Sequence, residues 1–127
     1  MENIVQAFSR KNKWAVVGVS ENKNKFGYKI YCFLRDNTNF LVYPVNPRVA
    51  QIDGRRCYSS LSDIPEKPDV VNFVVPPGIV SKVAREGMAL GINYYWLQPG
   101  SEDEETITWL KNKGATVISN ACVMREL

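Results

Sequence analysis

A short apolar run that ends in Gly-x-Ser and leads into a helix is the feature that most constrains the fold of this chain. The run is Trp14–Ser20, and after a loop that carries lysines the segment Phe26–Ile30 begins a helix. This order is typical of nucleotide-binding α/β domains, in which a glycine lets the backbone approach a phosphate and the helix presents unpaired N–H groups to it. Gly18 and Gly27 lie too far apart for the Gly-x-Gly-x-x-Gly dinucleotide motif. The segment therefore predicts a phosphate-bearing ligand without identifying it.

Apolar runs alternate with amphipathic segments along the rest of the chain. The pattern predicts strands at Trp14–Gly18, Phe40–Tyr43, Asp69–Val75, Asn93–Leu97 and Ala115–Ser119. It predicts helices over residues 3–11, 26–36 and 78–90, and from a Ser101/Glu104 capping box to about Lys113. Residues 48–62 are expected to be irregular, with a turn at Asp53-Gly54. Such alternation favours a parallel sheet, so we expect one domain over residues 1–127, a Rossmann-like three-layer α/β sandwich with a mainly parallel five-stranded sheet.

Composition excludes several classes of function. The chain has no histidine, which removes the commonest general base and metal ligand, and its three cysteines are scattered, so neither a disulfide framework nor a metal site is expected. The net charge of +3 suits a small anionic ligand better than nucleic acid. No run is long enough to cross a membrane and no secretion signal opens the chain, so a cytoplasmic location is expected.

Ligands of open parallel sheets bind beyond the carboxyl ends of the strands. That rule selects five short segments here: Gly18, Val19 and Ser20; Asn46, Pro47 and Arg48; Val75, Pro76 and Pro77; Gln98, Pro99 and Gly100; Asn120, Ala121 and Cys122.

The end of the second predicted strand distinguishes between ligands. An NAD site places a carboxylate there for the ribose hydroxyls, whereas this chain has Asn46 and Arg48. A basic residue suits a phosphorylated ribose, as in NADP or coenzyme A (CoA), and Lys23, Lys25 and Lys29 add attraction for a polyanion. Read alone, Asn-Pro is a turn and Arg48 a solvated charge. Beside a phosphate-type loop, we favour the ligand.

Several ordered motifs resemble the small stand-alone CoA-binding domain proteins, which are similar to the N-terminal domain of the succinyl-CoA synthetase alpha subunit. The motifs are Val16–Ser20, Tyr43–Arg48, Tyr58-x-x-Leu61-x-Asp63-Ile64-Pro65, Asp69–Val71, Val75–Pro77 and Trp96–Gly100. The resemblance implies a Rossmann-like fold that binds CoA through its strand-end loops.

The resemblance also implies which residues bind. Residues of the pyrophosphate loop would be Gly18, Val19, Ser20, Lys25, Phe26, Gly27 and Tyr28, with Asn46, Pro47 and Arg48 on the adenosine and 3′-phosphate side. Val75, Pro76, Pro77, Gln98 and Gly100 would line the remainder of the groove. This chain departs from the family at Phe26-Gly27, where we expect the glycine to loosen the helix start, and at Asn120-Ala121, where the family often has Asp-Arg.

We therefore expect non-catalytic binding of CoA or an acyl-CoA, with no catalytic residue assigned. The alternatives are an NADP-dependent oxidoreductase, which the short chain argues against, and a nucleotide-sensing regulatory module. Cys122 follows the last predicted strand and is expected either to be a buried apolar residue or to lie near the ligand and react with the CoA thiol.

Overall fold

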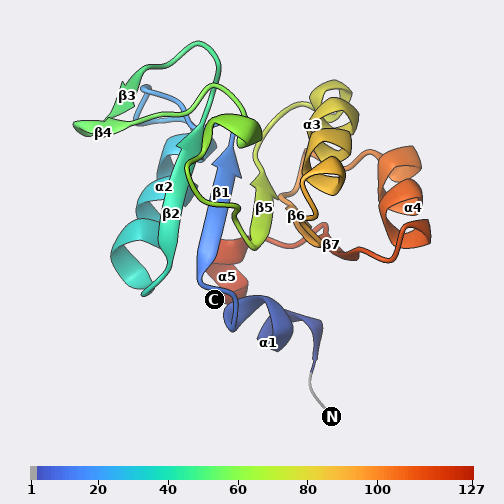
Figure 1. Ribbon diagram of the computed structural model, residues 1–127. Helices are drawn as coiled ribbons and strands as arrows, with labels where there is room; N and C mark the ends of the chain where they lie inside the picture. The colour runs from blue at the N-terminus through green and yellow to red at the C-terminus, as the bar shows by residue number, and fades with distance from the viewer. Residues whose placement is uncertain (1–2) are drawn as a thin grey trace.

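A five-stranded parallel sheet with the strand order β2-β1-β5-β6-β7 organises the computed structural model, which describes residues 3–127 (Figure 1). Its strands are β1 (Lys13–Val17), β2 (Leu41–Val45), β5 (Val70–Phe73), β6 (Tyr94–Leu97) and β7 (Thr116–Ser119). The helices are α1 (Ile4–Ser9), α2 (Phe26–Asn37), α3 (Pro77–Ala89), α4 (Glu104–Asn112) and α5 (Val123–Glu126). The chain moves outward from β1 to β2 and then crosses to β5, β6 and β7. The predicted Rossmann-like α/β fold is confirmed.

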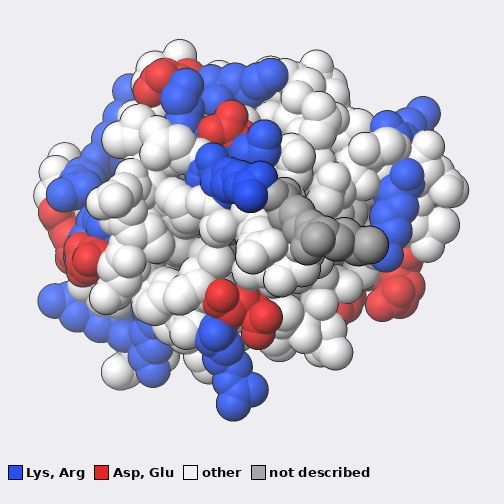
Figure 2. Space-filling view, turned by 90° about the horizontal axis from the view of Figure 1, so that it is seen from below, with Lys and Arg blue, Asp and Glu red and all other residues white. Residues whose placement is uncertain are grey.

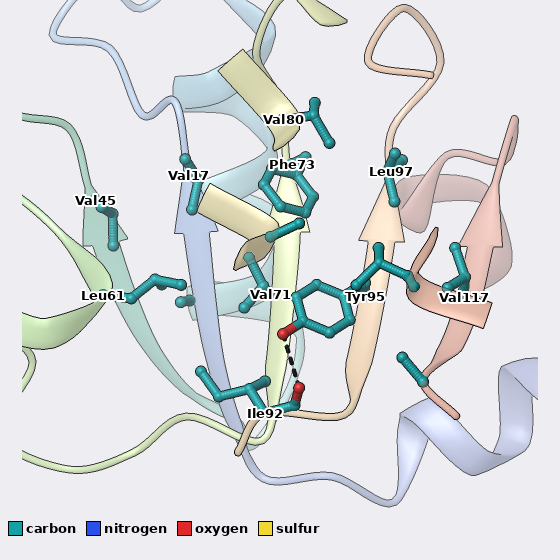
Figure 3. Packing of buried hydrophobic residues seen from close by; sticks show 14 of the residues in the cluster. Val17, Val45, Leu61, Val71, Phe73, Val80, Ile92, Tyr95, Leu97 and Val117 are labelled. Atoms are coloured by element: carbon teal, nitrogen blue, oxygen red, sulfur yellow. Dashed lines mark hydrogen bonds between the residues drawn. The ribbon is translucent and has the colours of Figure 1, made fainter. Parts of the chain in front are cut away.

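Helices cover both faces of the sheet and create two apolar layers. One layer lies under α3 and α4 and includes Val80 and Leu110, while the other lies under α1, α2 and α5. Figure 3 shows the first layer, in which Phe73 stacks near Tyr95 and the Tyr95 hydroxyl donates a hydrogen bond to the Ile92 carbonyl at 2.7 Å. Both faces of β1 and β5 are buried, which explains why these strands are almost entirely apolar.

Tryptophans anchor the second layer. Trp14 stacks on Phe40 with ring centroids 4.9 Å apart, and Phe8 meets the Trp96 ring edge-on at 5.4 Å. Each buried indole N–H has a partner, Lys11 O for Trp14 and Ala121 O for Trp96. Tryptophans on core-forming segments are expected to pack inside, and Trp96 is fully buried. The half-buried Trp109 packs against the first layer, with the Arg85 guanidinium 4.6 Å from its ring centroid.

The segment after β2 is more regular than predicted. β2 extends to Val45 and includes Pro44, which a sheet tolerates here because β2 is an edge strand and needs no N–H donor on its outer side. A hairpin of β3 (Gln51–Ile52) and β4 (Arg55–Arg56) follows, and then the 3₁₀ helix η1 (Leu61–Asp63). The predicted turn at Asp53-Gly54 is confirmed, with φ values of 50° and 77° as a type I′ turn requires.

Other expectations were wrong in ways that concern the carboxyl edge. The Ser101/Glu104 capping box does not form, since α4 begins after Asp103 and the Ser101 hydroxyl bonds elsewhere. Helical spacing groups Phe26 with Ile30 and Leu34 and predicts that it is buried, yet Phe26 is 64% exposed. The same spacing predicts that Ile79 and Leu90 point inward, but both are exposed because they lie at the two ends of α3. Helix α5 was not predicted.

Asn72 is a polar residue in the middle of the sheet. It is fully buried on β5 between Val16 and Trp96 of the neighbouring strands, and neither atom of its side-chain amide has a partner within residues 3–127. An unpaired buried amide costs about 1–3 kcal/mol.

We therefore expect Asn72→Val to raise the free energy of unfolding by about 1 kcal/mol, because valine removes both unpaired atoms and suits a central strand. Urea denaturation of the two proteins measures the difference. A less stable variant would contradict this account and would mean that a buried water satisfies the amide.

Candidate functional site

Two glycines bring the end of β1 and the start of α2 into direct contact. Gly18 follows β1 with φ +103°, and a Cβ at this position would lie 2.2 Å from the Val74 carbonyl oxygen after β5. Gly27 is buried in the first turn of α2, and a Cβ there would lie 2.0 Å from the Gly18 carbonyl oxygen. The expectation that Gly27 loosens the helix start was therefore wrong, because its missing side chain allows close packing.

This contact lies where the sheet topology reverses. After β1 the chain runs to α2 on one face of the sheet, and after β5 it runs to α3 on the other face (Figure 1). Ligands of doubly wound sheets bind in the crevice at this position. The structure thus places Gly18 and Gly27 at the switch point of the fold.

The loop before α2 is shaped by its own polar side chains. Ser20 Oγ accepts a hydrogen bond from Asn22 N at 3.0 Å, and Asn22 Oδ1 accepts one from Asn24 N at 2.9 Å. The N-cap residue of α2 is Lys25, and its side chain makes no capping hydrogen bond. The first N–H groups of this twelve-residue helix are thus left for an anion, with the exposed Lys25 beside them.

The end of β2 is tied to the same loop. The Asn46 side-chain amide donates to the Val19 carbonyl at 2.8 Å, and its Oδ1 accepts the Arg48 backbone N–H at 2.9 Å. Val19 is fully buried, so its role is to hold this carbonyl in place. The Arg48 side chain is exposed and has no partner within residues 3–127, which leaves its guanidinium available at the rim.

A pocket of about 420 Å³ opens on the other side of the switch point. It lies among the start of α2, the loops after β5 and β6, and the segment before α5. Its lining residues are Phe26, Ile30, Val74, Val75, Pro76, Gln98, Pro99, Gly100, Ser101 and Cys122. Five residues predicted for the groove are thereby brought together: Phe26, Val75, Pro76, Gln98 and Gly100.

Ser101 is a site residue that the sequence pattern misassigned. Its hydroxyl donates to the Val75 carbonyl at 2.6 Å and accepts the Val75 N–H at 3.0 Å, so it joins the loops after β5 and β6. The capping-box spacing to Glu104 concealed this role. Ile30 and Val74 were missed because their apolar side chains give no local signal of a pocket.

A second, polar pocket of about 200 Å³ lies between α2 and the β3–β4 hairpin and is lined by Tyr28 and Asp53 among others. The Asp53 carboxylate accepts hydrogen bonds from the Tyr28 hydroxyl at 2.9 Å and from Arg35 at 3.0 Å. The hydrogen bonds that Asp53 accepts from Arg35 and Tyr28 lower the pKa of its carboxyl group, and hydrogen bonding with Cys32 and with the Asp53 carboxylate raises the pKa of the Tyr28 hydroxyl. Tyr28 thus anchors the hairpin and lies apart from the larger pocket.

Other predicted residues lie at the rim. Pro47 and Pro77 are exposed, the latter as the first residue of α3, and neither lines a pocket. Cys122 is half-buried on the wall of the larger pocket and is therefore not a fully buried core residue. Within residues 3–127, no three Cys, Asp or Glu side chains gather as metal ligands, and no helix is long and apolar enough to cross a bilayer.

The face at the opposite, amino ends of the strands has a different character. Figure 2 shows Lys and Arg side chains scattered among Asp and Glu around a largely uncharged centre. One such pair joins Lys13 Nζ to Glu66 at 3.2 Å. Lys25 and Arg48, by contrast, lie at the carboxyl edge, because Lys25 immediately precedes α2 and Arg48 follows the end of β2.

Comparisons with known proteins agree with this geometry. A family described as "CoA binding domain" matches residues 12–127. An uncharacterised Bacillus subtilis protein, YneT, is 30% identical over 120 residues, covering 94% of this chain and 88% of its own length. A solved conserved hypothetical protein from Pyrococcus furiosus is 39% identical, with a TM-score of 0.85 over 91% of this chain and 99% of its own.

An enzyme subunit is also similar. The alpha subunit of ADP-forming acetate–CoA ligase II from Pyrococcus furiosus is 28% identical over 119 residues, which cover 86% of this chain. This chain spans only 26% of that subunit. The similarity thus concerns one part of a much longer protein.

The Gly18–Gly27 contact can be tested through stability. We expect Gly27→Ala to lower the free energy of unfolding by about 1–3 kcal/mol, because the new methyl group must displace the Gly18 backbone. Gly78→Ala is the matched control, since it also lies in a helix but its Cβ would meet nothing within 4 Å. The control should be neutral or up to about 1 kcal/mol more stable. Equal effects in urea denaturation would contradict the tight contact.

Proposed function

Because this chain belongs to the CoA-binding domain family, we propose that it binds CoA or an acyl-CoA at the carboxyl edge of its sheet, without catalysing a reaction. The observation that carries the proposal is the uncapped N-terminus of α2, packed through Gly27 on Gly18 at the switch point. A pyrophosphate there would accept hydrogen bonds from the free N–H groups of α2 and would be attracted by the positive charge of Lys25.

The proposed orientation of the ligand follows from the two sides of the switch point. Arg48 stands at the end of β2 with a free guanidinium, which suits the 3′-phosphate of the ribose. The apolar pocket on the other side, with Val75, Pro76 and Gln98 in its wall, suits the far end of the ligand. The proposed sequence of groups is thus phosphoribose near β2, pyrophosphate at α2 and thiol end near β6.

Binding without turnover agrees with the side chains at this edge. The sequence has no histidine, and the carboxylate of Asp53 is already engaged by Arg35 and Tyr28. The ligase activity named for the longer relative concerns a protein of which this chain spans a quarter, so we do not propose that activity here.

Calorimetric titration with CoA tests the proposal. We expect saturable binding, a rise in thermal stability with ligand, and co-purification of a CoA species detectable by native mass spectrometry. NADPH should compete poorly, since the pocket beyond the pyrophosphate is shaped for an apolar group. The absence of both heat and thermal shift at high micromolar CoA would rule the proposal out, and stronger binding of NADPH would favour an oxidoreductase.

Removing Arg48 tests the assignment of the 3′-phosphate. We expect Arg48→Ala to weaken CoA about tenfold and dephospho-CoA much less, because one charge-assisted hydrogen bond is lost only with the phosphorylated ligand. Arg85→Ala is a suitable control, since Arg85 is an exposed arginine stacked on Trp109 on the opposite face of the sheet. Equal losses for both ligands in the Arg48 variant would remove Arg48 from this role.

A further inference from the structure

In the loops after β5 and β6 that line the larger pocket, most backbone N–H groups are missing or already paired. Pro76 and Pro99 have no N–H group. The Val75 N–H bonds Ser101 Oγ, the Ser101 N–H bonds the Gln98 carbonyl, and the Gly100 N–H bonds Glu102. The Ser101 hydroxyl donates to Val75 O and accepts from Val75 N, so its donor is also in use.

Gln98 is the exception. Its side chain is 3% exposed and lines the pocket, and its Oε1 accepts the Val123 N–H at 3.2 Å. That bond fixes the orientation of the amide, because an N–H group needs the oxygen as its partner. The Gln98 NH₂ group remains without a partner among residues 3–127. Among its side chains, the pocket therefore offers one strong donor in a largely apolar wall.

We propose that this pocket holds the acyl chain of an acyl-CoA and that the Gln98 NH₂ group donates to the thioester carbonyl oxygen. The inference rests on the proposed function and specifies its ligand class as acylated rather than free CoA. One donor matches one carbonyl, while the wall of Phe26, Ile30 and Val74 matches a hydrocarbon chain.

The chemistry of the pocket argues against the alternative occupant, the pantetheine arm. That arm carries two amides and a hydroxyl, and buried amides need partners at a cost of about 1–3 kcal/mol each when unpaired. Among its side chains, the pocket has one free amide donor, that of Gln98, and the weakly donating Cys122 thiol. The polar arm thus fits the open groove outside, and the chain beyond the sulfur fits the pocket.

The size of the pocket limits the chain. One water molecule occupies about 30 Å³ in the liquid and a methylene group is of similar size, so 420 Å³ holds on the order of ten such groups. We therefore expect chains of up to about eight carbons to fit, and longer ones to extend into solvent.

Affinities of free, acetyl-, butyryl-, hexanoyl- and octanoyl-CoA for the wild-type protein provide the test. We expect tighter binding with length, by about two- to fourfold per methylene group, until the pocket is filled. Binding of free CoA as tight as that of octanoyl-CoA would overturn the acyl assignment while leaving CoA binding intact. Failure of every species to bind would instead overturn the proposed function.

Gln98→Glu tests the donor. Glutamate keeps an oxygen for the Val123 N–H but removes the NH₂ group, so the ratio of octanoyl-CoA to CoA affinity should fall about tenfold. Gln6→Glu is the matched control, because Gln6 Oε1 accepts a backbone N–H from Asn3 at 3.1 Å on α1, far from this edge. An unchanged ratio would overturn the role of Gln98.

Phe26→Ala keeps the proposal testable if the Gln98 variant fails to fold. Phe26 is 64% exposed and therefore contributes little to the core, yet it lines the pocket. In this variant each added methylene group should leave the affinity nearly unchanged. A length dependence identical to that of the wild-type protein would show that the chain lies elsewhere.

Discussion

The contact between Gly18 and Gly27 is the constraint on which the carboxyl edge depends. It lets the first turn of α2 pack directly against the Gly18 carbonyl, which follows β1, with no side chain between the two backbones. Helix α2 thus begins at the switch point with its first N–H groups uncapped. A side chain at Gly27 would collide with the Gly18 carbonyl, and one at Gly18 with the Val74 carbonyl after β5, so a larger residue at either position would disturb this junction.

Hydrogen bonds between loops extend this arrangement across the sheet. Asn46 joins the end of β2 to the β1 turn, and Ser101 joins the loop after β6 to the loop after β5. Each link uses a polar side chain, so these groups are no longer free for a ligand. Among the side chains that line the larger pocket, the amide of Gln98 is consequently the unpaired one.

The strand–helix alternation was predictable because buried parallel strands are nearly continuous apolar runs, as in β5, and the strand-end rule selects the edge at which the larger pocket opens. Local patterns failed where tertiary contacts decide. Ser101 has the spacing of a capping box with Glu104, yet its hydroxyl bonds the Val75 carbonyl. Phe26 has the same helical spacing as the buried residues of α2, yet it is exposed at the start of the helix. The β3–β4 hairpin and α5 are too short for periodicity to reveal, since their stability comes from the surfaces they contact.

The absence of a carboxylate directly after β2 is the reason to expect a phosphorylated ribose. The β3–β4 hairpin nevertheless brings a carboxylate, that of Asp53, to the neighbouring helix α2. Asp53 lies beside Tyr28 at the second pocket, and in NAD-binding proteins a carboxylate after the second strand binds the ribose hydroxyls. Its charge is balanced by Arg35 and its oxygen also accepts from Tyr28, which together hold its pKa below the ordinary range. A carboxylate so engaged fastens the hairpin to α2. The uncompensated charge at the end of β2 is that of Arg48, so the electrostatic preference at this end of the site remains for an anion.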